Sequence, residues 1–480
     1  MNQTGLPDAA GTAAPSRVRY WVLAFVCALS MITYLDRACL SAAATWIQQA
    51  LGLKSRGEMG TVFAAFSLAY ALFEVPTGWL GDVFGPKKVL IRIVLWWSAF
   101  TVLTGLAGLS IGGAVIGVGA LVVIRFLFGV GEAGAYPNIT RALHNWFPAA
   151  ERGRAQAAVW MSGRILGGLT FVIFGILIAG ISAWGIEPLM TWRHAFWAFG
   201  VIGVTWCVLF AWWFRDRPEQ KKSVNAAELA WIRSSAAETG ASRPRVPWLE
   251  ILSSPNLWLV CLMYFCFAYG WYFNITFLGP FFEDRYAVPA GSVLANLYKG
   301  GPLLLGAVGC LVGGLLTDRY VRRTGNRRWA RRLLGVTGLS LSSGVFVICH
   351  FLGHRISEPL VFALLLALTG FFADLTMPSA WAVCQDIGRR YAAIVAGAMN
   401  MIGALGGALA NWATGFVIQR SLAAHAAGLG LPANDLSAAQ RAAGELPGYH
   451  LNFLIFAGVF VVGAICWLLI DATRPVVPEE

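Results

Sequence analysis

Ionisable residues occur inside two of the most hydrophobic stretches of this chain. Asp36 and Arg37 are neighbours in one stretch, and Arg125 and Glu132 lie seven positions apart in another. A charge at membrane depth costs about 2.5 to 3.5 kcal/mol even on lenient insertion scales, so such residues usually line an ion or substrate path. These four residues therefore predict a route through a membrane for an ion or a charged solute.

The two arginines are candidates for binding an anion. A guanidinium group stays charged and can hold a carboxylate through two parallel hydrogen bonds. The alternative is a permanent ion pair with Asp36 or Glu132, although an isolated structural ion pair seldom compensates for its desolvation. The two interpretations overlap, because an arginine that is paired in the empty protein can release its partner when a substrate arrives.

Asp36 and Glu132 are candidates for carrying protons. Burial favours the protonated form of a carboxyl group, whereas a neighbouring arginine favours the ionised form, so an anion that occupies the arginine can switch the group. Arg125 and Glu132 are two helical turns apart and share a helix face. We therefore predict that protonation of the acids frees the arginines for the substrate.

The composition indicates that membrane-spanning helices position these residues. The chain has 480 residues, of which 58% are hydrophobic and only 12% charged, whereas soluble domains carry roughly 25% charged residues. A span needs about 20 mostly apolar residues. Twelve such runs begin near Tyr20, Glu58, Val89, Ala114, Gln156, Ala195, Asn256, Val293, Leu333, Leu360, Ala392 and Leu451. The sequence therefore predicts an all-α membrane protein with twelve transmembrane helices.

The formal charge of +12 indicates orientation. Basic residues gather in alternate short loops, for example Lys87 with Lys88, Arg152 with Arg154, and the segment 319–332. The positive-inside rule then places both termini in the cytoplasm. A nucleic-acid partner is not expected, because the chain has no aromatic-interleaved soluble domain to bind one. The lipid bilayer is the expected surrounding.

A polar segment divides the predicted helices into six and six. The expected parts are an N-terminal tail (1–19), a first bundle (20–214), a cytoplasmic linker (215–253), a second bundle (254–471) and a C-terminal tail (472–480). The sequences GWLGDVFGPKK (78–88) and GGLLTDRYVRR (313–323) occupy equivalent places, which indicates an internal repeat. The segment 419–450 is predicted to be a long external loop, with Pro432 and Pro447 as helix breakers.

These motifs resemble the loop signature of the major facilitator superfamily. The first copy of the signature consists of Gly78, Gly81, Asp82, Gly85, Lys87 and Lys88, and the second includes Asp318 and Arg319. ITYLDR (32–37), Arg125 with Glu132, DLTMPSAW (374–381) and DIGRRYAAIVAGAMNMIGALGG (386–407) resemble the anion:cation symporter branch. The resemblance implies two pseudo-symmetric six-helix bundles around a midplane cavity, in the bacterial cytoplasmic (inner) membrane.

The resemblance also implies roles for single residues. Tyr34, Tyr70, Asn400 and Trp381 match cavity-facing positions of the family, although without it they would be packing groups or interface anchors. Ser379 is a further candidate. Gly78, Asp82, Gly85, Lys87, Asp318 and Arg319 are expected to control a gate between the two halves.

Three further charged residues have open alternatives. Arg164 stands where sugar-acid members commonly carry an uncharged residue. It is either a third cationic contact for a doubly charged or bulkier acid, or a charge that snorkels toward the cytoplasmic side. Asp374 is a candidate second proton site. Glu74 is expected to be structural and to pair with the basic loop that follows Gly78.

The predicted function is proton-coupled uptake of an organic anion by a monomer, through alternating access. The resemblance favours a sugar acid such as a hexonate, hexuronate or aldarate. The alternatives are an exchanger of organic anions or organophosphates and a transporter-like membrane sensor. No enzyme activity, cofactor or metal is expected, because the chain has no Walker sequence, zinc-ligand spacing or identifiable nucleophile and base pair.

Overall fold

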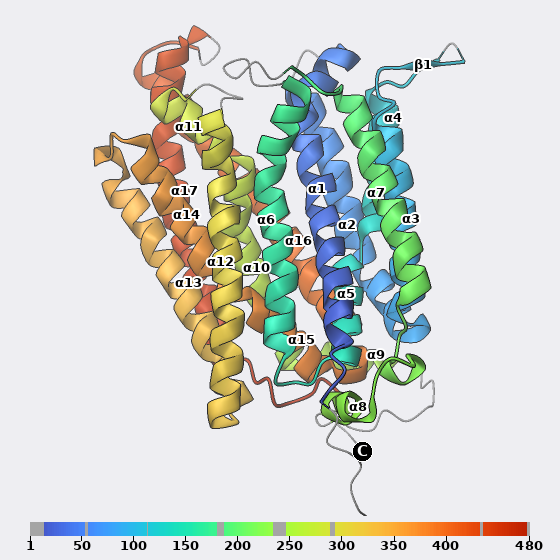
Figure 1. Ribbon diagram of the computed structural model, residues 1–480. Helices are drawn as coiled ribbons and strands as arrows, with labels where there is room; N and C mark the ends of the chain where they lie inside the picture. The colour runs from blue at the N-terminus through green and yellow to red at the C-terminus, as the bar shows by residue number, and fades with distance from the viewer. Residues whose placement is uncertain are drawn as a thin grey trace, which may run out of the picture.

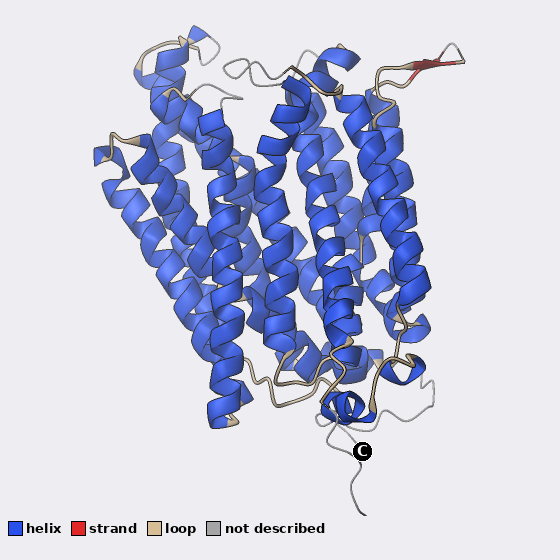
Figure 2. Ribbon diagram, in the orientation of Figure 1, coloured by secondary structure: helices blue, strands red, loops and turns tan. Residues whose placement is uncertain are grey.

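The computed structural model describes residues 14–52, 56–112, 114–179, 187–233, 246–288, 293–432 and 435–477. Most of the predicted N-terminal tail and the last residues of the C-terminal tail lie outside these ranges. The described chain is almost entirely helical, with one short β-hairpin (Figure 2). The helices run roughly side by side along a common direction (Figure 1).

The described residues of the first half form seven helices and the hairpin. They are α1 (Arg19–Leu51), α2 (Arg56–Phe84), α3 (Pro86–Thr104), β1 (Ser110–Ile111), β2 (Ala114–Val115), α4 (Val118–Glu132), α5 (Ala135–Trp146), α6 (Arg152–Ala179) and α7 (Trp192–Trp213). The linker then forms the 3₁₀ turn η2 (Pro218–Gln220), α8 (Ala226–Arg233) and α9 (Trp248–Ser253).

Among its described residues, the second half forms helices and no strand. Its elements are α10 (Pro255–Thr276), α11 (Leu278–Tyr286), α12 (Val293–Thr324), α13 (Arg327–Leu352), η3 (Gly353–Arg355), α14 (Pro359–Asp374), α15 (Met377–Gly388), η4 (Arg389–Tyr391), α16 (Ala392–Gly428) and α17 (Ala438–Leu469). Figure 1 shows α8 and α9 at one end of the bundle, which we call the linker end, and the hairpin at the opposite end, the hairpin end.

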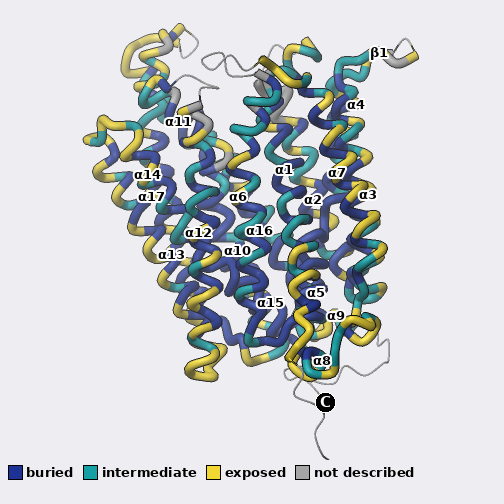
Figure 3. Tube along the Cα trace, viewed as in Figure 1, coloured by how far each residue is buried: buried dark blue, intermediate teal, exposed yellow. Residues whose placement is uncertain are grey.

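The described helices account for twelve membrane crossings. Ten segments are long and apolar enough to span a bilayer, and one of them, Pro359–Gly428, has 70 residues and contains both α14–α15 and α16. Helix α3 adds a further crossing, since its 19 residues correspond to about 28 Å at 1.5 Å per residue. Large apolar side chains such as that of Trp212, 76% exposed, lie on the surface, and exposed residues recur along the outer helices (Figure 3). The predicted all-α membrane fold is confirmed, and the protein is an integral membrane protein.

Two crossings are broken into two helices, which the sequence did not predict. Helices α4 and α5 meet at Gly134, whose φ of +81° is a left-handed conformation that glycine adopts without strain. The equivalent break in the second half separates α14 from α15 at Leu375 and Thr376. These breaks free backbone groups inside the bundle, where polar side chains can bind them.

The two halves approach each other closely where α6 meets α12. A Cβ atom added to Gly300 would lie only 2.9 Å from the carbonyl oxygen of Gly168. Small residues let membrane helices pack closely in this way, because lipid supplies no hydrophobic drive between helices. This contact between α6 and α12 lies beside the central cavity described below.

The predicted external loop at 419–450 is wrong. Helix α16 continues to Gly428, α17 already begins at Ala438, and Pro447 lies inside α17. The alanine-rich stretches favour helix, and Ser437 caps α17 by accepting a hydrogen bond from the Gln440 amide. The loop is therefore far shorter than the proline positions suggested.

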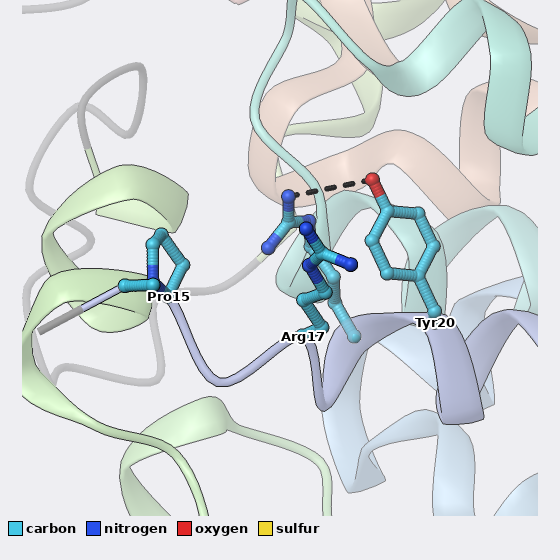
Figure 4. A pocket seen from close by; sticks show the side chains of 5 residues that line it. Pro15, Arg17 and Tyr20 are labelled. Atoms are coloured by element: carbon cyan, nitrogen blue, oxygen red, sulfur yellow. Dashed lines mark hydrogen bonds between the residues drawn. The ribbon is translucent and has the colours of Figure 1, made fainter.

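The linker is attached to the start of α1 by a buried cluster of charges. Glu228 of α8 accepts hydrogen bonds from the Ser16 hydroxyl, the Val18 amide and the Arg19 side chain, at 2.5, 2.9 and 3.0 Å. Arg19 also pairs with Glu151 at 3.0 Å. Figure 4 shows Arg17 and Tyr20 at a pocket of about 450 Å³ beside this cluster. The contacts hold α8 against the bundle.

We expect this attachment to weaken in acid. Burial alone would raise the pKa of Glu228, but the hydrogen bonds from Ser16, Arg19 and Val18 outweigh it and hold the pKa below the ordinary 4.5. The stabilisation is therefore complete above about pH 4.5 and is lost as the pH falls through the lower folded-state pKa. Hydrogen-exchange protection factors of α8 in detergent should decrease over that interval.

In the Glu228→Gln variant, hydrogen-exchange protection of α8 should already be weak at neutral pH. Glu219→Gln is the matched control. Glu219 pairs with Arg233 of α8, but this pair is exposed, and exposed ion pairs contribute little to stability. Equal protection of α8 in the wild type at pH 7 and well below pH 4 would contradict the assignment.

Candidate functional site

A small cavity lies between the two halves. Its volume is about 50 Å³, and α1, α2, α5 and α6 of the first half and α10 and α16 of the second half contribute to its wall. The lining residues are Tyr34, Arg37, Tyr70, Tyr136, Trp160, Arg164, Tyr264, Phe267, Ala268, Trp271, Tyr272, Asn400, Gly403 and Ala404. The wall is therefore aromatic and carries two guanidinium groups.

Arg37 forms the first charged contact of the cavity. Its Nε donates to Glu132 Oε1 at 2.6 Å, and its guanidinium lies 4.4 Å from the centre of the Tyr70 ring. The Arg37 side chain is 25% exposed, whereas that of Glu132, the last residue of α4, is completely buried. The arginine is thus presented to the cavity while its carboxylate partner lies behind it.

Arg125 and Asp36 lie outside the cavity wall. Arg125 is buried with its guanidinium 4.0 Å from the centre of the Phe128 ring, and it forms no ion pair with any residue that the structure describes. Neither carboxylate oxygen of Asp36 has a hydrogen-bond partner in the described part of the chain. Asp36, Glu132 and Arg37 all act electrostatically on Arg125. The four predicted residues therefore gather in one region, but only Arg37 lines the cavity.

Arg164 forms the second charged contact. Its Nε and Nη2 donate to the two carboxylate oxygens of Asp374 at 2.8 and 3.0 Å, and its Nη1 donates to the Tyr34 hydroxyl. The side chains of Arg164 and Asp374 are 1% and 0% exposed, so the snorkelling alternative is wrong. Because Arg164 belongs to α6 and Asp374 ends α14, this ion pair joins the two halves.

Glycines position Tyr34 against Arg164. A Cβ atom added to Gly163 or to Gly167 of α6 would meet the Tyr34 ring. These two glycines therefore let α1 approach α6 until the tyrosine hydroxyl reaches the guanidinium. Tyr34 lines the cavity.

Asn400 links the halves on the other side of the cavity. Its Nδ2 donates to the Tyr70 hydroxyl at 2.9 Å and to Glu74 Oε1 at 2.7 Å. The other oxygen of Glu74 accepts from the backbone amide of Gly134, at the break between α4 and α5, at 3.2 Å. Glu74 therefore does not pair with the basic loop as predicted, but satisfies the amide that the helix break leaves free.

Two residues predicted to contact the substrate, Trp381 and Ser379, do not line the cavity. Trp381 is fully buried, with its ring 5.1 Å from that of Trp160, and the Ser379 hydroxyl lies 3.1 Å from that of Thr317. The sequence reading missed Tyr136, Trp160 and Tyr272, which do line the cavity. The aromatic-rich segment YFCFAYGWYF (264–273) was an available signal for Tyr272. Tyr136 and Trp160 had none, because residue type alone does not show which face of a helix lines a cavity.

Charged residues close the linker end between the halves. Asp318 of α12 accepts from the Arg154 backbone amide at 2.8 Å and from its Nε at 3.1 Å. Asp386 of α15 lies 3.6 Å from Arg152 and 3.3 Å from Arg331. Among the described residues, every ion pair that joins the halves lies at this end, except that of Arg164. The described conformation is therefore closed at the linker end.

The first-half loop contributes to the same closure. Asp82 accepts from the Ile394 amide of α16 at 2.9 Å and lies 3.5 Å from Arg141, and Gly78 packs against the Ala393 carbonyl.

The remaining predicted gate residues lie away from the interface between the halves. Lys87 donates its backbone amide to Asp216 of the linker at 2.7 Å, and Gly85 turns with a φ of +87° beside the same aspartate. Arg319 is exposed and has no ion-pair partner within the described ranges.

Two halves with six membrane crossings each surround a cation-lined cavity and are joined by polar contacts at one end. This is the architecture of a secondary transporter. The chain belongs to the Major Facilitator Superfamily, whose family model matches residues 26–411.

Two relatives confirm the anion-transporter branch. The protein named Probable sulfoacetate transporter SauU, from Cupriavidus necator, is 33% identical over 456 residues, which are 95% of this chain and 94% of the relative. Probable galactarate/D-glucarate transporter GudP, from Escherichia coli, is 30% identical over 417 residues, 84% of this chain and 88% of the relative.

A solved structure supports the fold. The proton:xylose symporter XylE, bound to 6-bromo-6-deoxy-D-glucose, matches with a TM-score of 0.70 over 95% of this chain and 96% of its own. At 15% sequence identity, this likeness concerns the fold alone.

Neutralising Asp318 should open the linker end. Asp318→Asn weakens the charged link to Arg154 across the halves, and a hydrogen bond to a charged group contributes about 1.5 to 3 kcal/mol. Ala157 of α6 packs against Gly314 of α12, one turn from Asp318. In a cysteine-free background, Ala157→Cys should react about tenfold faster with an impermeant maleimide added at the linker end when Asp318→Asn is present.

The matched control is Asp471→Asn. Asp471 pairs with Arg328 within the second half, so its loss should leave the labelling rate unchanged. If Ala157→Cys reacts at the same rate with and without Asp318→Asn, the ion pair between Asp318 and Arg154 does not hold the halves together.

Proposed function

We propose that this protein imports an organic anion into the bacterial cell together with protons. The observation that carries the proposal is the placement of Arg37, a guanidinium presented to the central cavity, whose carboxylate partner Glu132 is buried behind it at 2.6 Å. An anion in the cavity can compete with Glu132 for the arginine, since both offer the same kind of acceptor.

Proton coupling follows from this competition. When an anion takes Arg37, Glu132 becomes a buried carboxylate without its main partner, and burial then favours its protonated form. Release of the anion restores the ion pair and expels the proton. Asp36, close to Arg125 and without a hydrogen-bond partner in the described chain, is a second acid available for protonation in the same region.

The membrane potential makes proton coupling useful for import. A monoanion that enters a negative-inside cell opposes about 2.3 kcal/mol per 100 mV. One accompanying proton cancels this term, and a second makes import electrically favourable. Two acids near the cavity arginine can therefore drive accumulation of an anion.

The proposed orientation places the linker end in the cytoplasm. The basic residues at that end, which include Arg154, Arg319 and Arg331, fit the positive-inside rule. The described conformation is then closed toward the cytoplasm. We propose that a single chain suffices, because the cavity wall and the contacts of the linker end all come from one copy.

The relatives support an acidic organic substrate. The names of the two proteins compared above specify sulfoacetate and galactarate or D-glucarate, all of which are organic acids. The sugar-acid expectation from the sequence belongs to the same class. An exchanger of organic anions or organophosphates is the second candidate, because it would use the same arginines without titrating acids. A sensor would bind its ligand without accumulating it.

Glu132→Gln separates symport from exchange. In proteoliposomes, the variant should lose accumulation driven by a pH gradient, because an amide cannot take up the proton. It should retain counterflow of internal for external anion, since Arg37 remains. Arg37→Gln should weaken binding by about 10- to 100-fold, as expected for loss of charged hydrogen bonds. Radiolabelled uptake and external pH should be recorded together.

Glu187→Gln is the control, because Glu187 lies outside the helices, before α7, and is exposed. Full gradient-driven accumulation by Glu132→Gln would refute Glu132 as the coupling group. Wild-type exchange without any proton movement would favour the exchanger, and saturable binding without transport would favour the sensor.

A further inference from the structure

The cavity contains a second arginine that, like Arg37, is paired with a carboxylate outside the cavity wall. Arg164 lines the cavity, whereas its carboxylate partner Asp374 does not. The pair is bidentate, and the guanidinium lies 3.9 Å from the centre of the Trp271 ring. Each cavity arginine is therefore held by a buried acid that lies outside the cavity, so an anionic group in the cavity can compete for either arginine.

Several donors around the cavity have no acceptor. The Nη2 of Arg37 and the indole Nε1 of Trp160 and of Trp271 are buried and find no hydrogen-bond partner among the described residues. All three residues line the cavity. Buried donors are normally satisfied, and a ligand that supplies acceptors would fit these donors.

The two arginines are close enough for a short ligand to reach both. Arg164 binds the hydroxyl of Tyr34, and Tyr34 precedes Arg37 by three residues on α1, which is about 4.5 Å along the helix axis. Arg37 and Arg164 line the same cavity of about 50 Å³. The two cations thus occupy neighbouring parts of one small space.

We propose that the substrate is a compact organic dianion, with one acidic group bound by Arg37 and the other by Arg164. This inference rests on the proposed function and specifies its substrate class. A carboxylate or sulfonate offers only acceptors, which matches the donors without partners. A polyhydroxylated monoanion would also bring hydroxyl donors, and the amide of Asn400 is already bound to Tyr70 and Glu74.

Arg164 also connects recognition of the second charge to the contact between the halves. Its partner Asp374 belongs to the second half, so an acidic group that takes Arg164 breaks this midplane ion pair. Asp374 is then a buried carboxylate without its main partner and takes up a proton. One dianion with two protons, on Glu132 and Asp374, makes a transport step that carries no net charge.

The test compares dianions with analogues of similar shape in which an amide replaces one of the two acidic groups. Binding to the purified full-length protein in detergent should be measured by calorimetry for malonate, succinate and sulfoacetate, each beside its monoamide. We expect at least one dianion to bind about tenfold or more tightly than its monoamide, which corresponds to about 1.4 kcal/mol. If no dianion binds more tightly than its monoamide, the inference is wrong.

Variants of the ion pair should act in opposite directions. Arg164→Gln should reduce the dianion preference to about one, with monoamide affinity retained through Arg37, and Arg164→Lys should keep part of the preference. Asp374→Asn should increase dianion affinity, because it removes the competing carboxylate. A merely structural ion pair would instead give an unchanged preference in all three variants, which would overturn the inference.

Asp318→Asn is the matched control, because it breaks another ion pair between the halves, away from the cavity. It should change the affinities for dianion and monoamide by the same factor. The proposed function fails separately: a dianion preference that depends on Arg164, without proton uptake, would refute the symport and leave the substrate class intact. Proton-coupled uptake with equal binding of dianions and monoamides would refute the substrate class alone.

Discussion

Each of the two arginines that line the cavity is paired with one buried carboxylate, and the rest of the site depends on these two ion pairs. Arg37 pairs with Glu132 at 2.6 Å and Arg164 pairs with Asp374 at 2.8 Å. Neither arginine readily loses its charge, whereas a carboxyl group can be neutralised by a proton. The acid is therefore the replaceable partner. In the proposed function, a solute with its own acidic group takes the arginine and leaves a protonated acid behind.

The fold provides this arrangement by combining close helix packing with local breaks. Gly163 and Gly167 let Tyr34 of α1 reach Arg164 of α6. The break at Gly134 frees a backbone amide that Glu74 binds, and Glu74 in turn holds Asn400 of the second half. Contacts between the halves thus occur at two levels, around the cavity and at the linker end. The proposed transport by alternating access requires both sets of contacts to change together, because in such transporters one half moves largely as a rigid body against the other.

Much of this could be predicted from residue types and spacing. The twelve crossings, the division into two halves and the region of Asp36, Arg37, Arg125 and Glu132 follow from hydrophobic runs interrupted by charges. Other features could not be predicted in this way. The alanine-rich ends of α16 and α17 resemble a loop when prolines are taken as breakers, and a helix break at Gly134 has no distinct sequence signal among the many glycines of the chain.

The sequence by itself determined that charges lie in membrane helices, since composition and the length of a span fix which segments are buried. Only the tertiary structure decided which charges face the cavity. Arg37 and Arg164 line it, while Arg125 packs against Phe128 and Trp381 against Trp160. Asp374 became the partner of Arg164 although 210 positions separate them. The physical reason is that helix rotation and the contact between halves depend on packing across the whole bundle, which no local pattern of residues encodes.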